Sequence, residues 1–154
     1  MPSYWLMKSE PSTYSIDDLK KYGHTYWDGV RNYQARNFMR DRMKKGDLVL
    51  FYHSNAEPSG IAGVARIRKE GYPDFTAWDK KDVHFDPKST KEKPLWLMVD
   101  IEFMEKFSRF ISLEDIKAQS KLKDMMVVQK GSRLSVQPVS SAHFEILRDM
   151  GRAK

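Results

Sequence analysis

The sequence contains no cysteine among its 154 residues. Disulfides, thiolate zinc sites, iron–sulfur clusters and cysteine nucleophiles are therefore excluded. Histidine is also scarce, because only four are present and no two have the i, i+4 or similar spacing of paired metal ligands. Glycine-rich phosphate loops and the GxSxG and HExxH motifs of hydrolases do not occur either. We therefore expect no metal and no cofactor.

Long hydrophobic runs are missing as well. The longest apolar runs, such as Leu48–Tyr52, have about five residues, whereas a membrane-spanning helix needs roughly 18. The first residues, MPSYW, lack the basic region and apolar core of a secretory signal. We therefore expect an intracellular protein, cytoplasmic or, in a eukaryote, nuclear, with no membrane partner.

What the chain has in excess is positive charge. Lysine and arginine number 27 against 21 aspartates and glutamates, which gives a net charge of +6 and a pI near 9.4. This balance suits a polyanionic partner such as nucleic acid. The length predicts a single domain over residues 1–154 with its own apolar core. Within it, residues 79–94 are rich in charge and proline, and we expect an exposed loop there.

Short strands and short helices alternate irregularly along the chain. Capping patterns begin helices at Ser15, Ser112 and Ser140 or Ser141, and a fourth helix is predicted over residues 32–43, closed by Gly46. The mixture is not a strict βαβ succession, so it predicts an α+β fold with a curved sheet or small barrel flanked by short helices. The strands are expected over residues 4–7, 47–53, 61–68, 95–107 and 134–137.

The densest group of unusual side chains lies between Tyr26 and Asn37. Trp27 precedes an Asp-Gly turn, where an indole can be half exposed and can stack on a nucleobase for about 1–3 kcal/mol. It could equally be a core tryptophan. Asparagine can read a base edge and arginine matches phosphate oxygens, although a solvated helix face would show the same pattern. The candidates are Trp27, Asn32 and Asn37 for the base, and Arg31 and Arg36 for the backbone.

Other polar residues follow apolar strands, in the positions where loops carry binding residues. Each of these groups could instead be a polar loop, a rigid turn or a surface ion pair between Lys8 and Glu10. The candidates for a base-binding pocket are Ser9, His53, Ser54, Asn55, Tyr72, Pro73 and Asp74, and those for phosphate binding are Lys8 and Arg133.

Seven stretches, taken together and in order, carry a family resemblance. They are WLMKSEP (5–11), YSIDDL (14–19), WDGVRNYQARNFMR (27–40), GDLVLFYHSN (46–55), GIAGVARI (60–67), YPD (72–74) and RLSVQPVS (133–140). The chain resembles the EVE domain family over nearly its whole length. The resemblance implies a PUA-like fold, in which helices pack on a mixed, barrel-like sheet.

The resemblance also implies kinship with YTH domains, which read N6-methyladenine in RNA with an aromatic cage. The resemblance to YTH domains implies that the base stacks on Trp27 and that Ser9 contacts the base. The further cage tryptophans have no firm counterpart, although Tyr72, Phe75 and Trp78 lie near the corresponding region. EVE domains are associated with modified cytosines in DNA and with modified bases in RNA.

We therefore expect a binding module rather than an enzyme. It would capture a modified base, cytosine or adenine in DNA or RNA, and it would act through an unidentified effector protein. The alternative is a small hydrolase of modified nucleosides or bases, similar to ASCH domains, with Lys8, Glu10 and His53 as acid and base groups. A protein-interaction module is a third reading.

Overall fold

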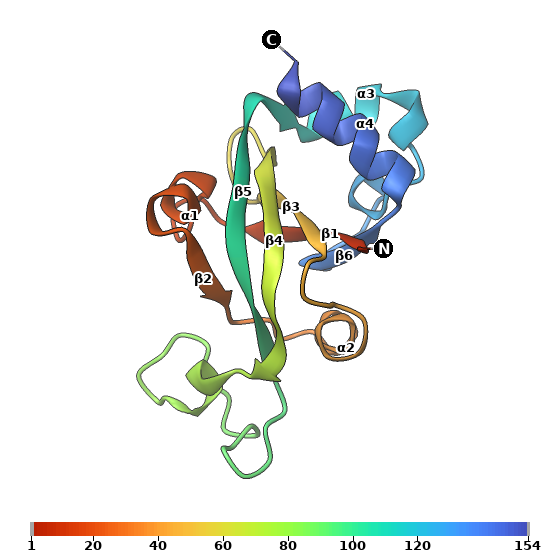
Figure 1. Ribbon diagram of the computed structural model, residues 1–154. Helices are drawn as coiled ribbons and strands as arrows, with labels where there is room; N and C mark the ends of the chain where they lie inside the picture. Colours follow the sequence, from red (N-terminus) through yellow and green to blue (C-terminus); the bar gives the residue numbers. More distant parts are fainter. Residues whose placement is uncertain (1, 154) are drawn as a thin grey trace.

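The computed structural model describes residues 2–153. Its centre is a six-stranded mixed sheet that is open and strongly curved, with short helices around it (Figure 1). This confirms the predicted α+β class. The strands are β1 (Tyr4–Ser9), β2 (His24–Trp27), β3 (Leu48–His53), β4 (Gly60–Pro73), β5 (Leu97–Ser112) and β6 (Val136–Val139).

The strand order is β2-β5-β4-β3-β1-β6, and every pairing is antiparallel except that of β1 with β3. Because these two strands are parallel, their C-terminal ends lie at the same edge of the sheet. The register places Ser9 beside His53. The polar residues that follow each strand are thereby brought together at that edge.

The helices begin where the capping patterns predict. Ser15 and Ser112 both form complete capping boxes, and the side chain of Ser140 caps the last helix. The predicted 32–43 helix is shorter: it ends at Asp41, and Gly46 lies in the following turn rather than at its end. The helices are α1 (Ile16–Tyr22), α2 (Tyr33–Asp41), α3 (Leu113–Ala118) and α4 (Ser141–Arg152), with 3₁₀ turns η1 (Phe75–Trp78), η2 (Ser120–Leu122) and η3 (Met126–Val128).

Each predicted strand differs from the observed one at one end or both, and β2 was not predicted. β4 and β5 are each longer than their apolar patterns, because several β-bulges let the paired strands bend and continue past the core. β6 begins later than residue 134 and includes Pro138, which an edge strand tolerates because one of its sides has no partner. The four-residue β2 is too short to show a clear alternation of its own.

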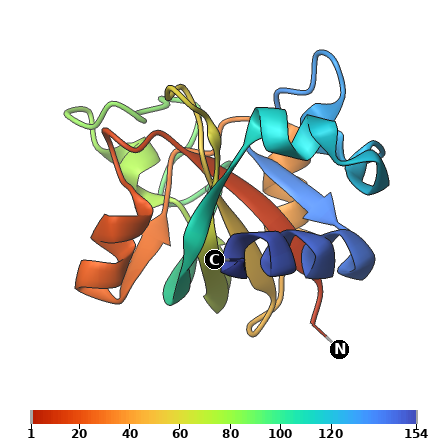
Figure 2. The same ribbon diagram turned by 90° about the horizontal axis from the view of Figure 1, so that it is seen from above.

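Two apolar clusters form the core, one on each face of the central strands. Along β1, Trp5 and Met7 belong to one cluster and Leu6 to the other, as strand alternation requires. The cluster around Leu6 is covered by α3 and α4 (Figure 2). The cluster around Trp5 contains Trp27 and packs against α1 and α2. No helix within residues 2–153 is long and apolar enough to cross a membrane.

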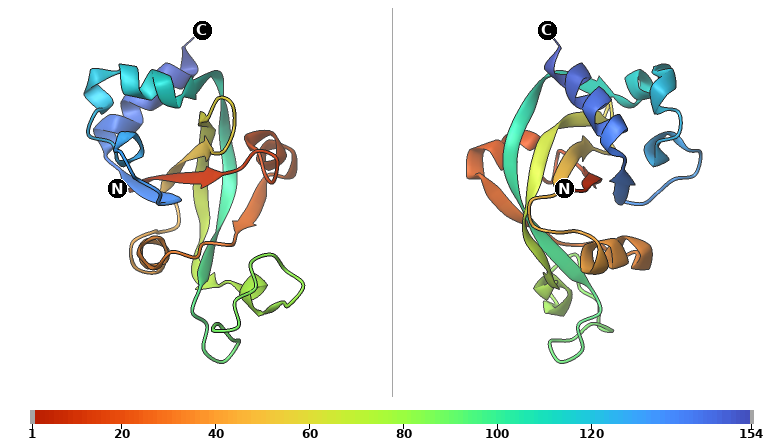
Figure 3. Two further views of the ribbon diagram at one scale, coloured as in Figure 1. Left: turned by 180° about the vertical axis from the view of Figure 1, so that it is seen from behind. Right: turned by 45° about the vertical axis from the view of Figure 1, so that its right-hand side comes forward.

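The 79–94 segment projects at the end of the sheet away from α3 and α4 (Figure 3). Its base is fixed by backbone hydrogen bonds from Asp74 to Trp96 and from Asp86 to Ala77. The loop therefore begins and ends beside β4 and β5, and it reaches back toward β2.

Candidate functional site

A cleft of about 560 Å³ opens at the edge where β1 and β3 end, and a recess of about 360 Å³ adjoins it. Its walls come from β1, β2, the loop after β3, the 79–94 loop and the segment before β6. The residues lining both parts are Lys8, Ser9, Thr13, Trp27, Asp28 and His84. The larger part is also lined by Glu10, Gly29, Val30, Ser54, Asn55, Ser132, Arg133 and Ser135.

Trp27 forms a wall of the cleft from the end of β2. Its ring meets the ring of Phe51 edge-on, with centroids 5.6 Å apart and planes at 78°. The residue is only 9% exposed, so the half-exposed platform expected from the sequence is a mostly buried wall instead. Because it belongs to the core cluster, its small exposed portion is held rigidly at the cleft.

Lys8 and Ser9 enter the cleft from the last two positions of β1. The Ser9 hydroxyl donates to the carbonyl oxygen of Tyr14 at 2.7 Å, which leaves its oxygen lone pairs as acceptors. The Lys8 ammonium lies 5.6 Å from the centre of the Tyr52 ring, and burial lowers the pKa of Lys8. These two residues provide one cation and one small polar group on the same wall.

The loop after β3 adjoins this wall, since the Ser54 N–H donates to the Ser9 carbonyl oxygen at 2.9 Å, and Arg133 also lines the cleft. Asn55 adopts a left-handed backbone with φ 49°, and its amide donates to a Glu10 carboxylate oxygen at 2.6 Å. Ser54 lies beside it in the lining of the cleft. Arg133 is exposed, and both it and Lys8 line the cleft, so the lining contains two cationic residues.

The predicted polar residues of α2 lie outside the cleft, with their side chains in use elsewhere. Asn32 caps the helix, its oxygen accepting from the Ala35 N–H at 3.1 Å. Arg36 donates to the Asn37 side chain at 2.9 and 3.1 Å and to the Leu95 carbonyl at 3.1 Å. These contacts fix the helix start and tie α2 to the segment before β5.

His53 and Tyr72 likewise have structural contacts and do not line the cleft. The Nε2 atom of His53 accepts from the Ile16 N–H at 3.1 Å, and burial lowers the pKa of the imidazole. The Tyr72 hydroxyl donates to Asp100, and burial raises the pKa of Tyr72. Pro73 ends β4 beside it, also away from the cleft.

Asp74 lies behind the cleft as a fully buried carboxylate. It accepts hydrogen bonds from the Gly29 N–H and the Arg31 guanidinium, both at 2.9 Å, and from Thr76. Burial raises the pKa of Asp74, but these hydrogen bonds outweigh it and the net pKa is lowered. Arg31 also donates to the His84 carbonyl at 2.6 and 3.2 Å. The pair therefore joins the turn after β2 to the 79–94 loop.

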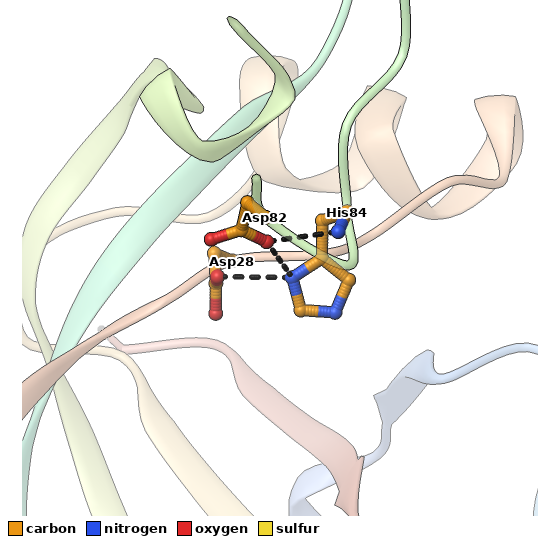
Figure 4. Close-up of side chains that lie close together, drawn as sticks. All are labelled: Asp28, Asp82 and His84. Carbon is orange, nitrogen blue, oxygen red and sulfur yellow. Dashed lines mark hydrogen bonds and ion pairs between the residues drawn. The ribbon is translucent and has the colours of Figure 1, made fainter. Parts of the chain in front are cut away.

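A cluster that was not among the sequence candidates consists of Asp28 and His84, which line the cleft, and Asp82 beside them (Figure 4). The His84 Nδ1 atom lies 3.1 Å from an Asp28 oxygen and 3.4 Å from an Asp82 oxygen, and Asp82 also accepts from the His84 backbone N–H at 2.8 Å. The carboxylates thus serve to hold the imidazole. No local pattern in the charged loop marks His84, because its partner Asp28 is 56 residues away in sequence.

The fold and this cleft together define a PUA-like α+β binding domain. The chain belongs to the EVE domain family, whose model matches residues 3–150. Thymocyte nuclear protein 1 of Danio rerio is 47% identical over 95% of this chain and 71% of its own length.

Solved structures support the same assignment. A Pseudomonas syringae protein has a TM-score of 0.94 and 48% identity, covering 97% of this chain and 99% of its own. The human THYN1 protein, solved in complex with 5-methylcytosine-containing DNA, has a TM-score of 0.91 and 42% identity, covering 99% of each chain. An ASCH protein of Zymomonas mobilis shares the fold alone, at 7% identity and a TM-score of 0.54.

Proposed function

We propose that this protein is a nucleic-acid-binding module whose cleft captures a modified base, with 5-methylcytosine in DNA as the leading ligand. The observation that carries the proposal is that a chain 42% identical, with nearly the same fold, has been solved with 5-methylcytosine-containing DNA. The positive net charge of this chain is consistent with that partner. Modified adenine and RNA remain further ligand classes of the same proposal.

The cleft has the parts that such a capture needs. Trp27 supplies a rigid apolar wall for the base and its methyl group, and Ser9 and Ser54 supply small polar groups at its edges. Lys8 and Arg133 line the cleft, and in this proposal they contact the phosphates that flank the captured base. A base that leaves its stack to enter the cleft would regain through these contacts the few kcal/mol that flipping costs.

Further parts of the proposal concern the whole chain. We propose a single EVE domain in which residues 79–94 are an insertion-like loop. The location would be the cytoplasm, or the nucleus in a eukaryote, as the name of the animal relatives suggests. A reader of this size would act through an effector protein.

The test is fluorescence-detected binding of short duplexes that carry one 5-methylcytosine, each compared with its unmodified twin. DNA and RNA would be measured at low and moderate salt. A fully buried methyl contributes about 0.8 kcal/mol, so we expect the methylated duplex to bind roughly fourfold more tightly. Equal affinity of the twins would contradict the proposal, and mass spectrometry of modified nucleosides incubated with the protein would then test the hydrolase alternative.

The matched variants are Trp27→Phe and Trp78→Phe. Trp27→Phe keeps an aromatic side chain in the core but withdraws part of the cleft wall, so the preference for the methylated strand should fall. Trp78 is partly exposed in η1 and does not line the cleft. Trp78→Phe should therefore leave the preference unchanged. An unchanged preference in Trp27→Phe and in Trp27→Ala would rule out Trp27 as the wall.

A further inference from the structure

His84 is the one residue of the 79–94 loop that lines the cleft, and it is fixed in place by contacts from Asp28, Gly29 and Arg31 as well as from Asp82 in its own loop. Asp28 holds the Nδ1 atom at 3.1 Å. Arg31 donates two hydrogen bonds to the His84 carbonyl oxygen. Gly29 lies against the imidazole ring itself. These contacts hold the imidazole in a defined position at the cleft.

Gly29 packs closely against the imidazole ring of His84. A Cβ atom added at Gly29 would lie 2.5 Å from Nε2 and 2.7 Å from Cε1 of His84, well inside van der Waals contact. Gly29 also has φ +79°, which glycine adopts without strain. The Asp28-Gly29 turn therefore provides both the hydrogen bond and the space that set the position of His84.

The Asp28 contact also sets the chemistry of the ring. An ionised carboxylate only accepts hydrogen bonds, so Nδ1 of His84 carries the proton. In the neutral imidazole the other nitrogen is then an acceptor. Nε2 lies on the side of the ring away from both carboxylates, and it has no hydrogen-bond partner within residues 2–153 (Figure 4). In the neutral ring, Nε2 of this cleft-lining residue is therefore the acceptor.

We infer that His84 reads the edge of the captured base and selects bases that present an exocyclic amino group. This inference rests on the proposed function. Cytosine presents an N4 amino donor, whereas thymine and uracil present an O4 acceptor at the same place. An acceptor at Nε2 pairs with the amino group and repels the carbonyl oxygen. His84 thus distinguishes 5-methylcytosine from thymine, two bases with the same methyl group.

The experiment uses the full chain and four DNA duplexes that differ only in one central pair. The read base is cytosine, 5-methylcytosine, uracil or thymine, each with its Watson–Crick partner. The four affinities separate the effect of the methyl group from the effect of the amino group. Because the cost of opening a given pair is the same for every protein variant, the change in an affinity ratio on mutation isolates the side chain.

The variants are His84→Phe, Asp28→Asn and His143→Phe as the matched control on α4. In His84→Phe the ratio of 5-methylcytosine to thymine affinity should fall by roughly 2- to 13-fold, the range of one lost hydrogen bond. The ratio of 5-methylcytosine to cytosine should stay as in the wild type. Asp28→Asn can donate as well as accept at Nδ1, so it should relax the same ratio. His143→Phe should change neither ratio.

The outcomes separate the two claims. If the wild type prefers 5-methylcytosine to cytosine but His84→Phe leaves the ratio to thymine unchanged, the inference fails and the proposed function stands. If the wild type binds the methylated and unmethylated twins equally, yet His84→Phe still lowers both amino-to-carbonyl ratios, methyl reading fails and edge reading stands. Absence of binding to all four duplexes overturns both.

Discussion

Two polar segments meet at the cleft, and their roles are the reverse of what their sequences indicate. Residues 27–37 contain the side chains best suited to touch a nucleic acid, but only residues 27–30 line the cleft. Residues 79–94 look like a bare charged loop, yet they supply His84. Arginine and asparagine can fix neighbouring backbone as readily as they can bind a ligand. Residue type therefore does not distinguish a supporting side chain from a contacting one.

The largest expected effect is on stability, at a residue that supports the cleft without lining it. Asp74→Ala removes a buried carboxylate and leaves the Gly29 N–H and the Arg31 guanidinium without their acceptor. We expect the free energy of unfolding in urea to fall by about 2–4 kcal/mol. Asp149→Ala, at an exposed position on α4, is the control and should change it by less than about 0.5 kcal/mol. A loss as small as the control's would mean that Asp74 does not hold the two segments together.

The same carboxylate predicts a pH dependence. The pKa of Asp74 is lowered on folding, because its hydrogen bonds outweigh burial, so its stabilisation is full above the unfolded value near 3.8. It is lost as the pH falls through the lower folded pKa. The unfolding free energy of the wild type should therefore fall more steeply below about pH 4 than that of Asp74→Ala. Parallel curves in acid denaturation would contradict this.

A smaller effect separates backbone strain from the placing of His84. Gly29→Ala and Gly23→Ala each put a side chain at a positive φ, +79° and +86°, at a cost of about 1–2 kcal/mol. Only Gly29→Ala crowds His84, since nothing lies within 4 Å of a Cβ at Gly23. We expect both to lower thermal stability and only Gly29→Ala to lose base selectivity. Equal selectivity in the two variants would show that the seating of His84 is irrelevant to binding.

The smallest effect on stability is expected at a residue that lines the cleft and would contact the ligand. Arg133→Ala removes an exposed cation at the cleft, so unfolding should change by less than about 0.5 kcal/mol. Affinity for methylated and unmethylated duplexes should fall by the same factor, and the slope of log K against log salt should lessen by about 0.9. The control is Arg68→Ala, exposed on β4 and outside the cleft. If Arg133→Ala and Arg68→Ala behave alike, Arg133 meets no phosphate.

Much of the fold could be predicted because its signals are local. The capping boxes of Ser15 and Ser112 and the alternation of Trp5, Leu6 and Met7 are set by near neighbours in sequence. The end of α2 could not be predicted, because Met43 is buried whether or not the helix reaches it.

The candidate site was predictable only in part, because some of its contacts join residues far apart in the sequence. Ser9, Trp27, Ser54, Asn55, Lys8 and Arg133 were candidates, and the structure brings all of them to one cleft. His84 was not, because its contact with Asp28 spans 56 residues. Nor does the sequence show that the Asn32 side-chain oxygen accepts a hydrogen bond as the cap of α2. Long-range partners decide which polar groups remain available to a ligand.

The most direct measurement is a titration of the protein with the 5-methylcytosine duplex, followed through the indole N–H resonances of its four tryptophans. Trp27 lines the cleft, whereas the Trp5 indole is buried against Asp47 and the Trp96 indole donates to Asp86. We predict that the Trp27 signal shifts most, and shifts more with the methylated duplex than with its twin. If the Trp27 resonance does not shift and the largest shift occurs at another tryptophan, a base-binding cleft at this edge of the sheet is contradicted.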